Sequence, residues 1–279
     1  MKKIFIVVSS LKTGGAEMQA VWLANKFAET THDVSLVVLK RGLEIDSLVS
    51  EQVEIIEFKM YVYDNLKSFR LFRVFYNFFM GVYNFRNSIK NSDKEIVVFS
   101  FLFHSNILSF LSTFKLQCKH YICIRGDRFS SRKGARNLKY RSFLVYLISF
   151  FSSGLVFNSQ KSLKNLGKKF SSRIKKYFIP NAVLRPQTKE SDETINKILT
   201  FLDSSEISMI SVGRLENLKN YQSIILAIKD LLNQGIPIKY IIFGKGYLDK
   251  KLDELIKSNN LEENILLIGM VPNVYNYYK

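Results

Sequence analysis

The chain has 279 residues, of which 47% are hydrophobic, and this is enough to bury the cores of one large or two medium domains. Its formal net charge is +17, and it contains two cysteines, Cys118 and Cys123, without partners at metal-ligand spacing. The composition excludes a disulfide framework and a cysteine-based metal cluster. It favours a reduced, cytoplasmic environment and an anionic partner.

Strand-like and helix-like segments alternate along the first part of the chain. The apolar run Ile4–Val8 is too short for a signal peptide and no cleavage pattern follows it, so it is predicted as a buried strand. Ile96–Phe114 is long enough to suggest a membrane span, but His104, Asn106 and several serines interrupt it, which favours a strand and a helix start. The other predicted strands are Val34–Leu39, Val53–Phe58, Ile96–Phe99, Tyr121–Ile124, Gly154–Phe157 and Tyr177–Ile179, and the predicted helices are Ala16–Thr30, Asn65–Lys90, Ile107–Phe114, Leu138–Phe151 and Ser159–Leu166.

This alternation predicts an α/β fold with a parallel, doubly wound sheet that is buried on both faces. A polar stretch after Pro180 predicts a linker, and the alternation then restarts. The predicted organisation is a first domain over 1–180, a linker over 181–195 and an incomplete second domain over 196–279. The second domain is predicted to contain strands at Ile207–Val212, Ile238–Phe243 and Ile265–Ile268 and helices at Tyr221–Asn233 and Leu248–Ser258.

The segment Gly213–Asn220 is the strongest candidate for a binding site. It joins a predicted buried strand to a helix, and it places Arg214 and Lys219 beside the helix N-terminus. Free backbone N–H groups, a guanidinium fork and an ammonium group together favour a bound phosphate. The alternative is an ordinary connecting loop with solvated cations.

Two further glycine turns follow predicted strands. Gly14 and Gly15 precede the first helix, and Gly244 and Gly246 follow the strand that ends at Phe243. Glycines at the carboxyl ends of parallel strands allow a ligand to approach the backbone, although they also occur in plain turns. Neither turn has the spacing of a dinucleotide-binding fingerprint, which makes a dinucleotide cofactor a weak interpretation.

The charge is concentrated in one part of the chain. Residues 115–176 contain sixteen Lys and Arg residues and one acid, Asp127, and the predicted helix Asn65–Lys90 interleaves aromatic and basic side chains. These two regions favour contact with an anionic membrane surface. A core helix packed on the sheet is the alternative for 65–90, and a nucleic acid is the rival anion, although no recognised nucleic-acid motif is present.

The order of these motifs resembles the retaining glycosyltransferases of family 4, the glycosyl transferases group 1, which have the GT-B fold of two Rossmann-like domains facing across a cleft. The resemblance covers the whole chain in order. It is carried by Gly14-Gly15-Ala16-Glu17, Ile179-Pro180-Asn181-Ala182-Val183, Gly213-Arg214-Leu215 with Lys219-Asn220, Phe243-Gly244-Lys245-Gly246 and Ile268-Gly269-Met270-Val271.

The resemblance implies a role for each matching position. Arg214 and Lys219 would hold the diphosphate of a nucleotide sugar and stabilise its departing charge without a metal or other cofactor. Gly14 and Gly15 would form the loop near the phosphate and the acceptor. The turns at Gly213, Gly244, Gly246 and Val271 would contact the nucleotide.

Other positions depart from the family pattern. Some members carry a histidine near the fourth strand, where this chain has Phe101 with His104 three residues later. His104 is therefore a candidate catalytic residue, with a helix-start histidine as the alternative. Arg125 resembles a strand-end arginine of one bacterial subgroup, with a solvated charge as the alternative. The Glu-x7-Glu pair of the family is expected beyond the last predicted strand and is absent, so the chain is expected to be truncated.

The sequence thus predicts an enzyme that transfers a sugar from a nucleotide-diphosphate donor to a cell-envelope glycan or lipid-linked acceptor, in capsule, lipopolysaccharide or related polysaccharide synthesis. It is expected in the cytoplasm, peripheral to the inner face of the membrane, with no metal and no nucleic-acid partner. A catalytically impaired remnant of such an enzyme and a basic nucleic-acid-binding module remain as alternatives.

Overall fold

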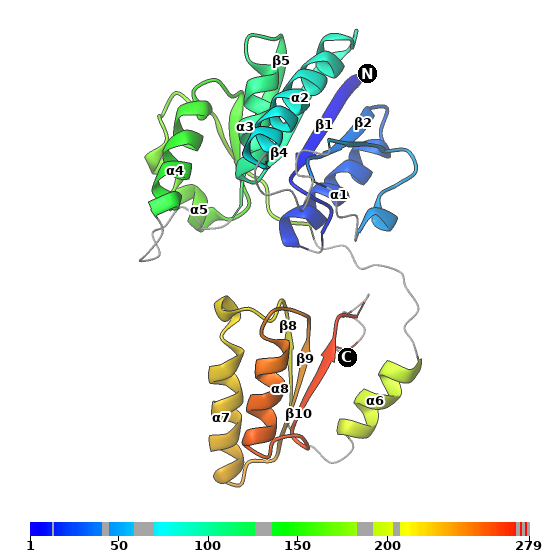
Figure 1. Cartoon of the computed structure of the whole chain (residues 1–279), viewed down its shortest axis with the longest axis vertical. Coiled ribbons are helices and arrows are strands. Elements are labelled where there is room, and N and C mark those ends of the chain that lie inside the picture. Colours follow the sequence, from blue (N-terminus) through cyan, green and yellow to red (C-terminus); the bar gives the residue numbers. More distant parts are fainter. Residues whose placement is uncertain are drawn as a thin grey trace. The chain divides into compact units, whose positions relative to one another are not determined.

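The chain folds into two units, residues Met1–Val183 (unit 1) and Leu184–Lys279 (unit 2), shown in Figure 1. The structure, a computed structural model, describes residues 1–12, 14–40, 45–58, 70–125, 136–182, 192–202 and 207–271, together with 274 and 277. The boundary between the units falls close to the predicted end of the first domain at residue 180. The part of the predicted linker from 183 to 191 lies outside the described residues.

Unit 1 is built on a seven-stranded parallel sheet with the order β3-β2-β1-β4-β5-β6-β7. This order reverses direction between β1 and β4, as in doubly wound α/β folds. The strands are β1 (Lys2–Val8), β2 (Asp33–Val38), β3 (Glu54–Glu57), β4 (Glu95–Phe101), β5 (Cys118–Ile124), β6 (Gly154–Phe157) and β7 (Lys176–Phe178), and the helices are α1 (Gly15–Ala28), α2 (Arg70–Lys90), α3 (Phe103–Thr113), α4 (Arg136–Ser149) and α5 (Gln160–Asn165), with short 3-10 turns at Asp46–Leu48 and Gly167–Lys169.

Helices cover both faces of this sheet, because alternate strand residues point to opposite sides. Ile4 and Ile6 of β1 pack in the same core as α1, whereas Phe5 of β1 packs in the core that holds Phe85 of α2. A third core joins β5 and β6 to α4 and includes Val145. The continuous apolar runs of the sequence are thus explained by burial on two sides.

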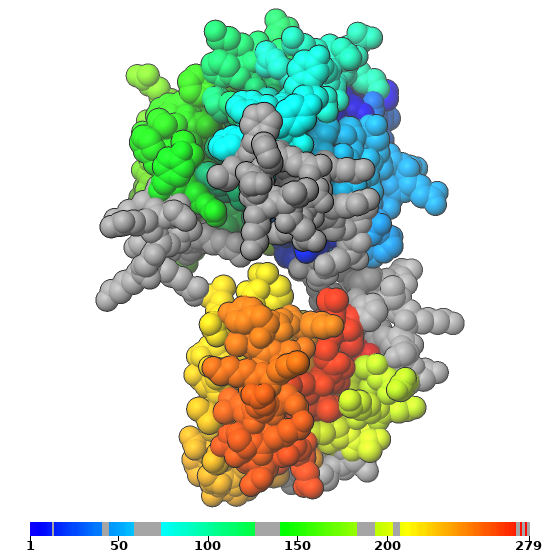
Figure 2. Space-filling model, in the orientation of Figure 1, coloured from blue at the N-terminus to red at the C-terminus, as the bar shows by residue number. Residues whose placement is uncertain are grey.

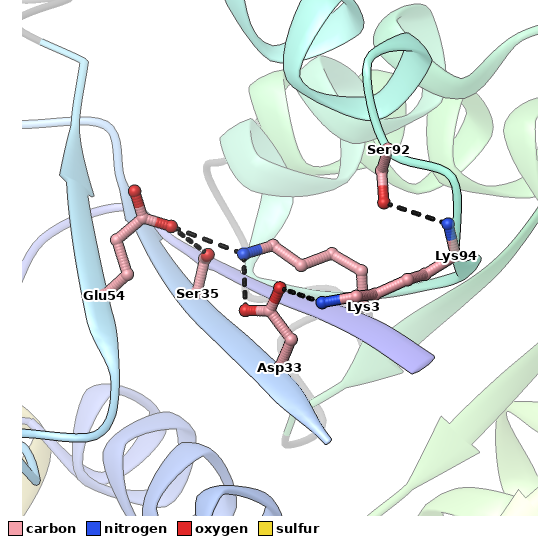
Figure 3. Close-up of polar contacts among 6 residues, drawn as sticks. All are labelled: Lys3, Asp33, Ser35, Glu54, Ser92 and Lys94. Atoms are coloured by element: carbon pink, nitrogen blue, oxygen red, sulfur yellow. Dashed lines mark hydrogen bonds and ion pairs between the residues drawn. The ribbon is translucent and has the colours of Figure 1, made fainter. Parts of the chain in front are cut away.

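A network of charged side chains ties the amino ends of four strands together (Figure 3). Lys3 Nζ lies 2.7 Å from Asp33 Oδ1, and Lys94 Nζ lies 2.8 Å from Asp33 Oδ2. Ser35 donates a hydrogen bond to Glu54 Oε2 at 2.6 Å. Burial alone would raise the pKa of Asp33, but hydrogen bonds and charges from Lys3 and Lys94 outweigh it and lower that pKa. This edge is opposite to the carboxyl ends of the strands and serves stability.

Unit 2 contains a three-stranded parallel sheet with the order β10-β9-β8, with helices on both faces (Figure 1). Ile225 of α7 and Leu252 of α8 pack in one core, and Ile198 of α6 packs with Ile241 and Phe243 on the other face. The elements are α6 (Asp192–Leu202), β8 (Ile207–Val212), a 3-10 turn at Asn217–Lys219, α7 (Tyr221–Asn233), β9 (Ile238–Phe243), α8 (Asp249–Ser258) and β10 (Ile265–Gly269).

Two expectations about unit 2 are wrong. The linker was expected to extend to residue 195, but α6 begins at Asp192, because apolar residues at helical spacing allow this segment to cover the sheet. The strand at Ile207–Val212 was expected to be buried, but among the described residues β8 lies at an edge of the three-stranded sheet, and Ile207 and Met209 are exposed. The α/β class and the predicted order of strands and helices are confirmed for the described residues.

Candidate functional site

Three glycines mark the carboxyl edge of the sheet of unit 2. The amide of Gly213, after β8, donates to the carbonyl of Phe243 at 2.9 Å, and the amide of Gly244, after β9, donates to the carbonyl of Gly269 at 2.7 Å. Hydrogen bonding between the strands therefore continues into the turns. Because carboxyl ends of parallel strands form the ligand-binding edge of open α/β sheets, these turns lie where a ligand would bind.

The turns after β8 and β9 pack backbone against backbone. A Cβ atom on Gly244 would lie 2.9 Å from the carbonyl carbon of Gly213 and closer still to its oxygen, and Gly244 has a φ of +149°. A Cβ atom on Gly246 would lie 2.7 Å from both the carbonyl carbon and the nitrogen of Leu215. No side chain fits at either position, so the two predicted glycines are required for the approach of the two loops.

Arg214 and Lys219 lie on the same loop, between β8 and α7. Both side chains belong to exposed residues, and Arg214 Nη1 forms an ion pair with Glu216 Oε1 at 2.9 Å. Lys219 ends the 3-10 turn, and its Nζ lies 3.6 Å from the point where a Cβ of Gly213 would stand. The ammonium group therefore lies over the Gly213 backbone. Asn220 then adopts a left-handed conformation with a φ of +55° at the start of α7.

Three further residues, to which the sequence assigned no function, hold this loop in place. Leu215 is fully buried and anchors the loop in the core. The Tyr221 hydroxyl donates to the carbonyl of Gly213 at 3.2 Å, and the Tyr247 hydroxyl accepts from the amide of Asn217 at 3.0 Å. A tyrosine that directly follows a Gly-x-Gly turn gives no recognisable signal, because its partner lies 30 residues earlier in the chain.

Val271, the remaining predicted nucleotide contact, follows β10. It is half-buried and packs against the core that contains Ile198 and Phe243. The structure thus brings Gly213, Arg214 and Lys219 together with Gly244 and Gly246, and it places Val271 beside the end of the neighbouring strand.

In unit 1, the point where the strand order reverses lies between β1 and β4. The loop that carries Gly14 leaves β1 there, and the helix that carries His104 begins after β4. Ser9 Oγ and Ser105 Oγ lie 3.4 Å apart and connect the two strand ends. Ligands of open α/β sheets bind at such a switch point, so Gly14, Gly15 and His104 belong to one candidate site.

A strained turn and a buried network position the first turn of α3. Leu102 has a φ of +70°, a conformation that costs a residue with a side chain about 1–3 kcal/mol. Ser100 Oγ donates to Asn106 Oδ1 at 2.8 Å and lies 2.8 Å from His120 Nε2. Burial lowers the pKa of His120 to about 3, so its ring is neutral and structural. Backbone strain at a switch point is typical of functional sites.

His104 lies in this first turn of α3, close to the positive charges of Lys40 and Arg141. Burial lowers the pKa of its imidazole, and the charges of Lys40 and Arg141 lower it further. The ring of His104 contacts the ring of Phe103 at 5.5 Å between centroids, and Arg141 lies over the Phe103 ring at 5.2 Å. The imidazole is therefore held neutral near pH 7, which suits a hydrogen-bonding role.

The glycine loop of unit 1 differs in charge from that of unit 2. Glu17, in the first turn of α1, folds back so that its carboxyl carbon lies 3.1 Å from the position of a Cβ on Gly14, with one oxygen closer still. A Cβ on Gly15 would meet no atom within 4 Å. An anion that approaches Gly14 therefore meets a carboxylate.

Arg125 is not a solvated charge. Its guanidinium stacks on the ring of Phe101 at 4.7 Å and donates a hydrogen bond to Asn181 Oδ1, and burial lowers its pKa. Gln19 of α1 holds the next residue with two bonds, because its Nε2 donates to the Ala182 carbonyl at 2.6 Å and its Oε1 accepts from the Ala182 amide at 2.9 Å. Phe101 is fully buried under Arg125 and does not line a site. Together these contacts hold the segment from Pro180 to Ala182, called the Pro-Asn segment below, on the rest of unit 1.

No group of three or more His, Cys, Asp or Glu residues is close enough to hold a metal ion in the part of the chain that the structure describes. Among the described helices, none combines the length and apolar character needed to cross a bilayer.

Comparison with known proteins supports the family resemblance. Residues 191–279 match the family model of "Glycosyl transferases group 1". The chain is 32% identical over 136 residues to the N-acetylgalactosamine-N,N'-diacetylbacillosaminyl-diphospho-undecaprenol 4-alpha-N-acetylgalactosaminyltransferase of Campylobacter jejuni, covering 48% of this chain and 35% of that enzyme. It is 27% identical to a second Campylobacter jejuni enzyme, GalNAc-alpha-(1->4)-GalNAc-alpha-(1->3)-diNAcBac-PP-undecaprenol alpha-1,4-N-acetyl-D-galactosaminyltransferase, over 100% of this chain and 71% of that one.

Solved structures share the fold. Anabaena Alr3699/HepE in complex with UDP and glucose matches 98% of this chain and 71% of its own, with a TM-score of 0.72 and 15% identity. Sucrose-phosphate synthase from Thermosynechococcus elongatus matches 100% of this chain and 73% of its own, with a TM-score of 0.76 and 12% identity. The predicted GT-B fold of Rossmann-like α/β units is confirmed, and residues 191–279 match the glycosyl transferases group 1 model.

Proposed function

We propose that this chain, whose residues 191–279 carry a glycosyl transferases group 1 domain, transfers a sugar from a nucleotide diphosphate to an acceptor. The observation that carries the proposal is the loop between β8 and α7. It brings the cations of Arg214 and Lys219 to a glycine-lined sheet edge, with the Lys219 side chain over the Gly213 backbone. A diphosphate gains charge as the sugar leaves, and fixed cations stabilise that charge in the transition state.

Roles follow from this arrangement. Arg214 offers a planar fork to two phosphate oxygens, and Lys219 supplies a point charge above Gly213. Gly244 and Gly246 let the loop after β9 pack on the Gly213 loop, and the nucleotide is proposed to lie along the edge that the two loops form, with Val271 beside it. No metal or other cofactor enters this scheme, because the two cations supply the charge for the leaving group.

The acceptor side is assigned to unit 1, where Gly14, Gly15 and His104 flank the switch point. We propose a lipid-linked or cell-envelope glycan acceptor, since both Campylobacter jejuni relatives carry undecaprenol diphosphate glycans in their names. Capsule, lipopolysaccharide or a related polysaccharide is the proposed product, formed at the cytoplasmic face of the membrane. We also propose retention of the anomeric configuration, which NMR of the product anomer tests.

Binding of UDP, the nucleotide held by the solved neighbour, tests the donor site. Each of Arg214→Ala and Lys219→Ala removes a charge-assisted hydrogen bond worth about 1.5–3 kcal/mol, so the Kd for UDP should rise about 10- to 150-fold in titration calorimetry. The affinity for uridine should change little, because uridine has no phosphate. Lys251→Ala on α8 removes an exposed cation of the same unit and serves as the control. Equal losses of UDP and uridine binding would contradict the assigned roles.

A further inference from the structure

Helix α2 presents a band of aromatic side chains to solvent. Phe75, Phe79 and Tyr83 recur at four-residue spacing and are 61%, 62% and 59% exposed, and Tyr76 beside them is also exposed. Residues on the other side of the helix, including Phe85, pack in the core of unit 1. A helix that needs only one apolar face for folding thus carries a second one, and such a face marks an interaction surface.

The band continues across α3 to the end of α4. Arg86 of α2 donates to the carbonyls of Ser112 and Phe114 at 3.0 and 2.9 Å, which joins α2 to the end of α3. Phe114 in turn packs edge-to-face on Phe151, with 5.5 Å between ring centroids. We call the exposed residues of these helices the aromatic face; they are Phe75, Tyr76, Phe79, Met80, Tyr83, Leu111, Phe114, Tyr140, Phe143, Leu147, Phe150 and Phe151.

The aromatic face lies on one side of unit 1. Helices α2 and α4 both pack on α3. Figure 2 shows α2 (cyan) and α4 (green) on the same side of the unit.

The charged side chains of the helices that carry this face have one sign. Helix α2 contains no Asp or Glu, and neither does the described part of the chain from Ile96 to Ala182. The exposed lysines Lys90 and Lys115 lie at the ends of α2 and α3, and Lys115 Nζ lies over the Phe114 ring at 5.7 Å. Aromatic side chains bordered by cations, on helices that carry no carboxylate in their described residues, complement an interface at which anionic groups cover an apolar interior.

We propose that the aromatic face docks unit 1 on an anionic lipid bilayer. Aromatic rings partition into the interfacial region of a bilayer, and cations beside them gain from the negative surface potential. A second copy of this chain is a poorer occupant, because an isologous contact would set the cations of one copy's helices against the same cations of the other. The inference rests on unit 1 alone and does not depend on sugar transfer.

Vesicle binding by the full chain tests this proposal. The protein should bind vesicles that contain phosphatidylglycerol at least ~10-fold more tightly than phosphatidylcholine vesicles, and salt should weaken that binding. The variant F75S/F79S/Y83S should lose ~30-fold or more of its affinity, because it removes three interfacial rings. Leu226→Ser, at an exposed site on α7 in unit 2, is the matched control and should bind as the original protein does. An unchanged urea-unfolding transition of Trp22, which lies on α1 of unit 1, establishes that F75S/F79S/Y83S is folded, and unchanged UDP binding does so for Leu226→Ser in unit 2.

Fluorescence gives a second measurement that does not depend on loss of binding. Trp22 is the one tryptophan of the chain, so W22F/F79W carries a single reporter on the aromatic face. Its emission should shift to the blue with vesicles and be quenched by brominated lipid, whereas that of W22F/L226W should not. Undiminished vesicle binding by F75S/F79S/Y83S overturns the proposal. The proposal is also overturned if the original protein does not bind vesicles but forms a dimer or a nucleic-acid complex that F75S/F79S/Y83S abolishes.

Discussion

The close approach of the loops after β8 and β9 predicts that Gly244→Ala destabilises unit 2. The φ of +149° costs a residue with a side chain about 1–3 kcal/mol. The new Cβ would stand 2.9 Å from the carbonyl carbon of Gly213 and closer to its oxygen, so that loop must move and give up the bond from the Gly213 amide to Phe243, worth about 1 kcal/mol. Overlap strain adds about 1–3 kcal/mol. We expect a loss of roughly 3–7 kcal/mol.

Urea unfolding separates this effect from changes in unit 1. Trp22 lies on α1, so its fluorescence follows unit 1, whereas far-UV circular dichroism follows both units. Gly244→Ala should add an early transition in circular dichroism and leave the Trp22 transition in place. It should also abolish UDP binding.

The matched control is Gly269→Ala, at a strand end with a φ of +88° and no atom within 4 Å of the new Cβ. It should cost only the conformational part, about 1–3 kcal/mol. Equal costs for the two alanine variants would refute the role of close approach.

Two predictions concern unit 1. Because the folded pKa of Asp33 is lowered, its stabilisation is present above the unfolded pKa of 3.8 and is lost as the pH falls through the folded pKa. Asp33→Asn should therefore cost about 1 kcal/mol in urea unfolding at pH 7, discounted for partial exposure, and much less at pH 3. Arg125→Ala should cost about 1–3 kcal/mol and speed hydrogen exchange at the Ala182 amide, because the Pro-Asn segment loses one of its two fastenings.

Each of these two predictions has its own control. Asp249→Asn changes a carboxylate in unit 2 that belongs to no such network, and an Asp33→Asn effect that is equally large at pH 3 would contradict the assigned ion pairs. Arg125→Lys keeps the charge but not the flat guanidinium that stacks on Phe101. If it restored slow exchange at Ala182, charge rather than stacking would be responsible.

Local pattern and parallel topology made part of the site predictable from the sequence. Gly213 and Gly244 were placed at one edge because carboxyl ends of parallel strands meet there. The contact between Gln19 and Ala182 was not predictable, since it joins residues 163 apart and Gln19 belongs to no recognised motif. The exposure of β8 was missed for a related reason, because an apolar run does not reveal whether its strand lies at the edge of a sheet.

The two glycine loops have similar construction and opposite charge. In each, a charged residue that follows the first glycine, from the first turn of α1 in unit 1 and from the 3-10 turn before α7 in unit 2, folds back over that glycine. The residue is Glu17 over Gly14 in unit 1 and Lys219 over Gly213 in unit 2. An ammonium group there attracts a diphosphate, whereas a carboxylate repels one and accepts hydrogen bonds from hydroxyl groups. These opposite charges support the proposal that the donor diphosphate binds at the Gly213 loop of unit 2 and that sugar hydroxyls of the acceptor bind at the Gly14 loop of unit 1.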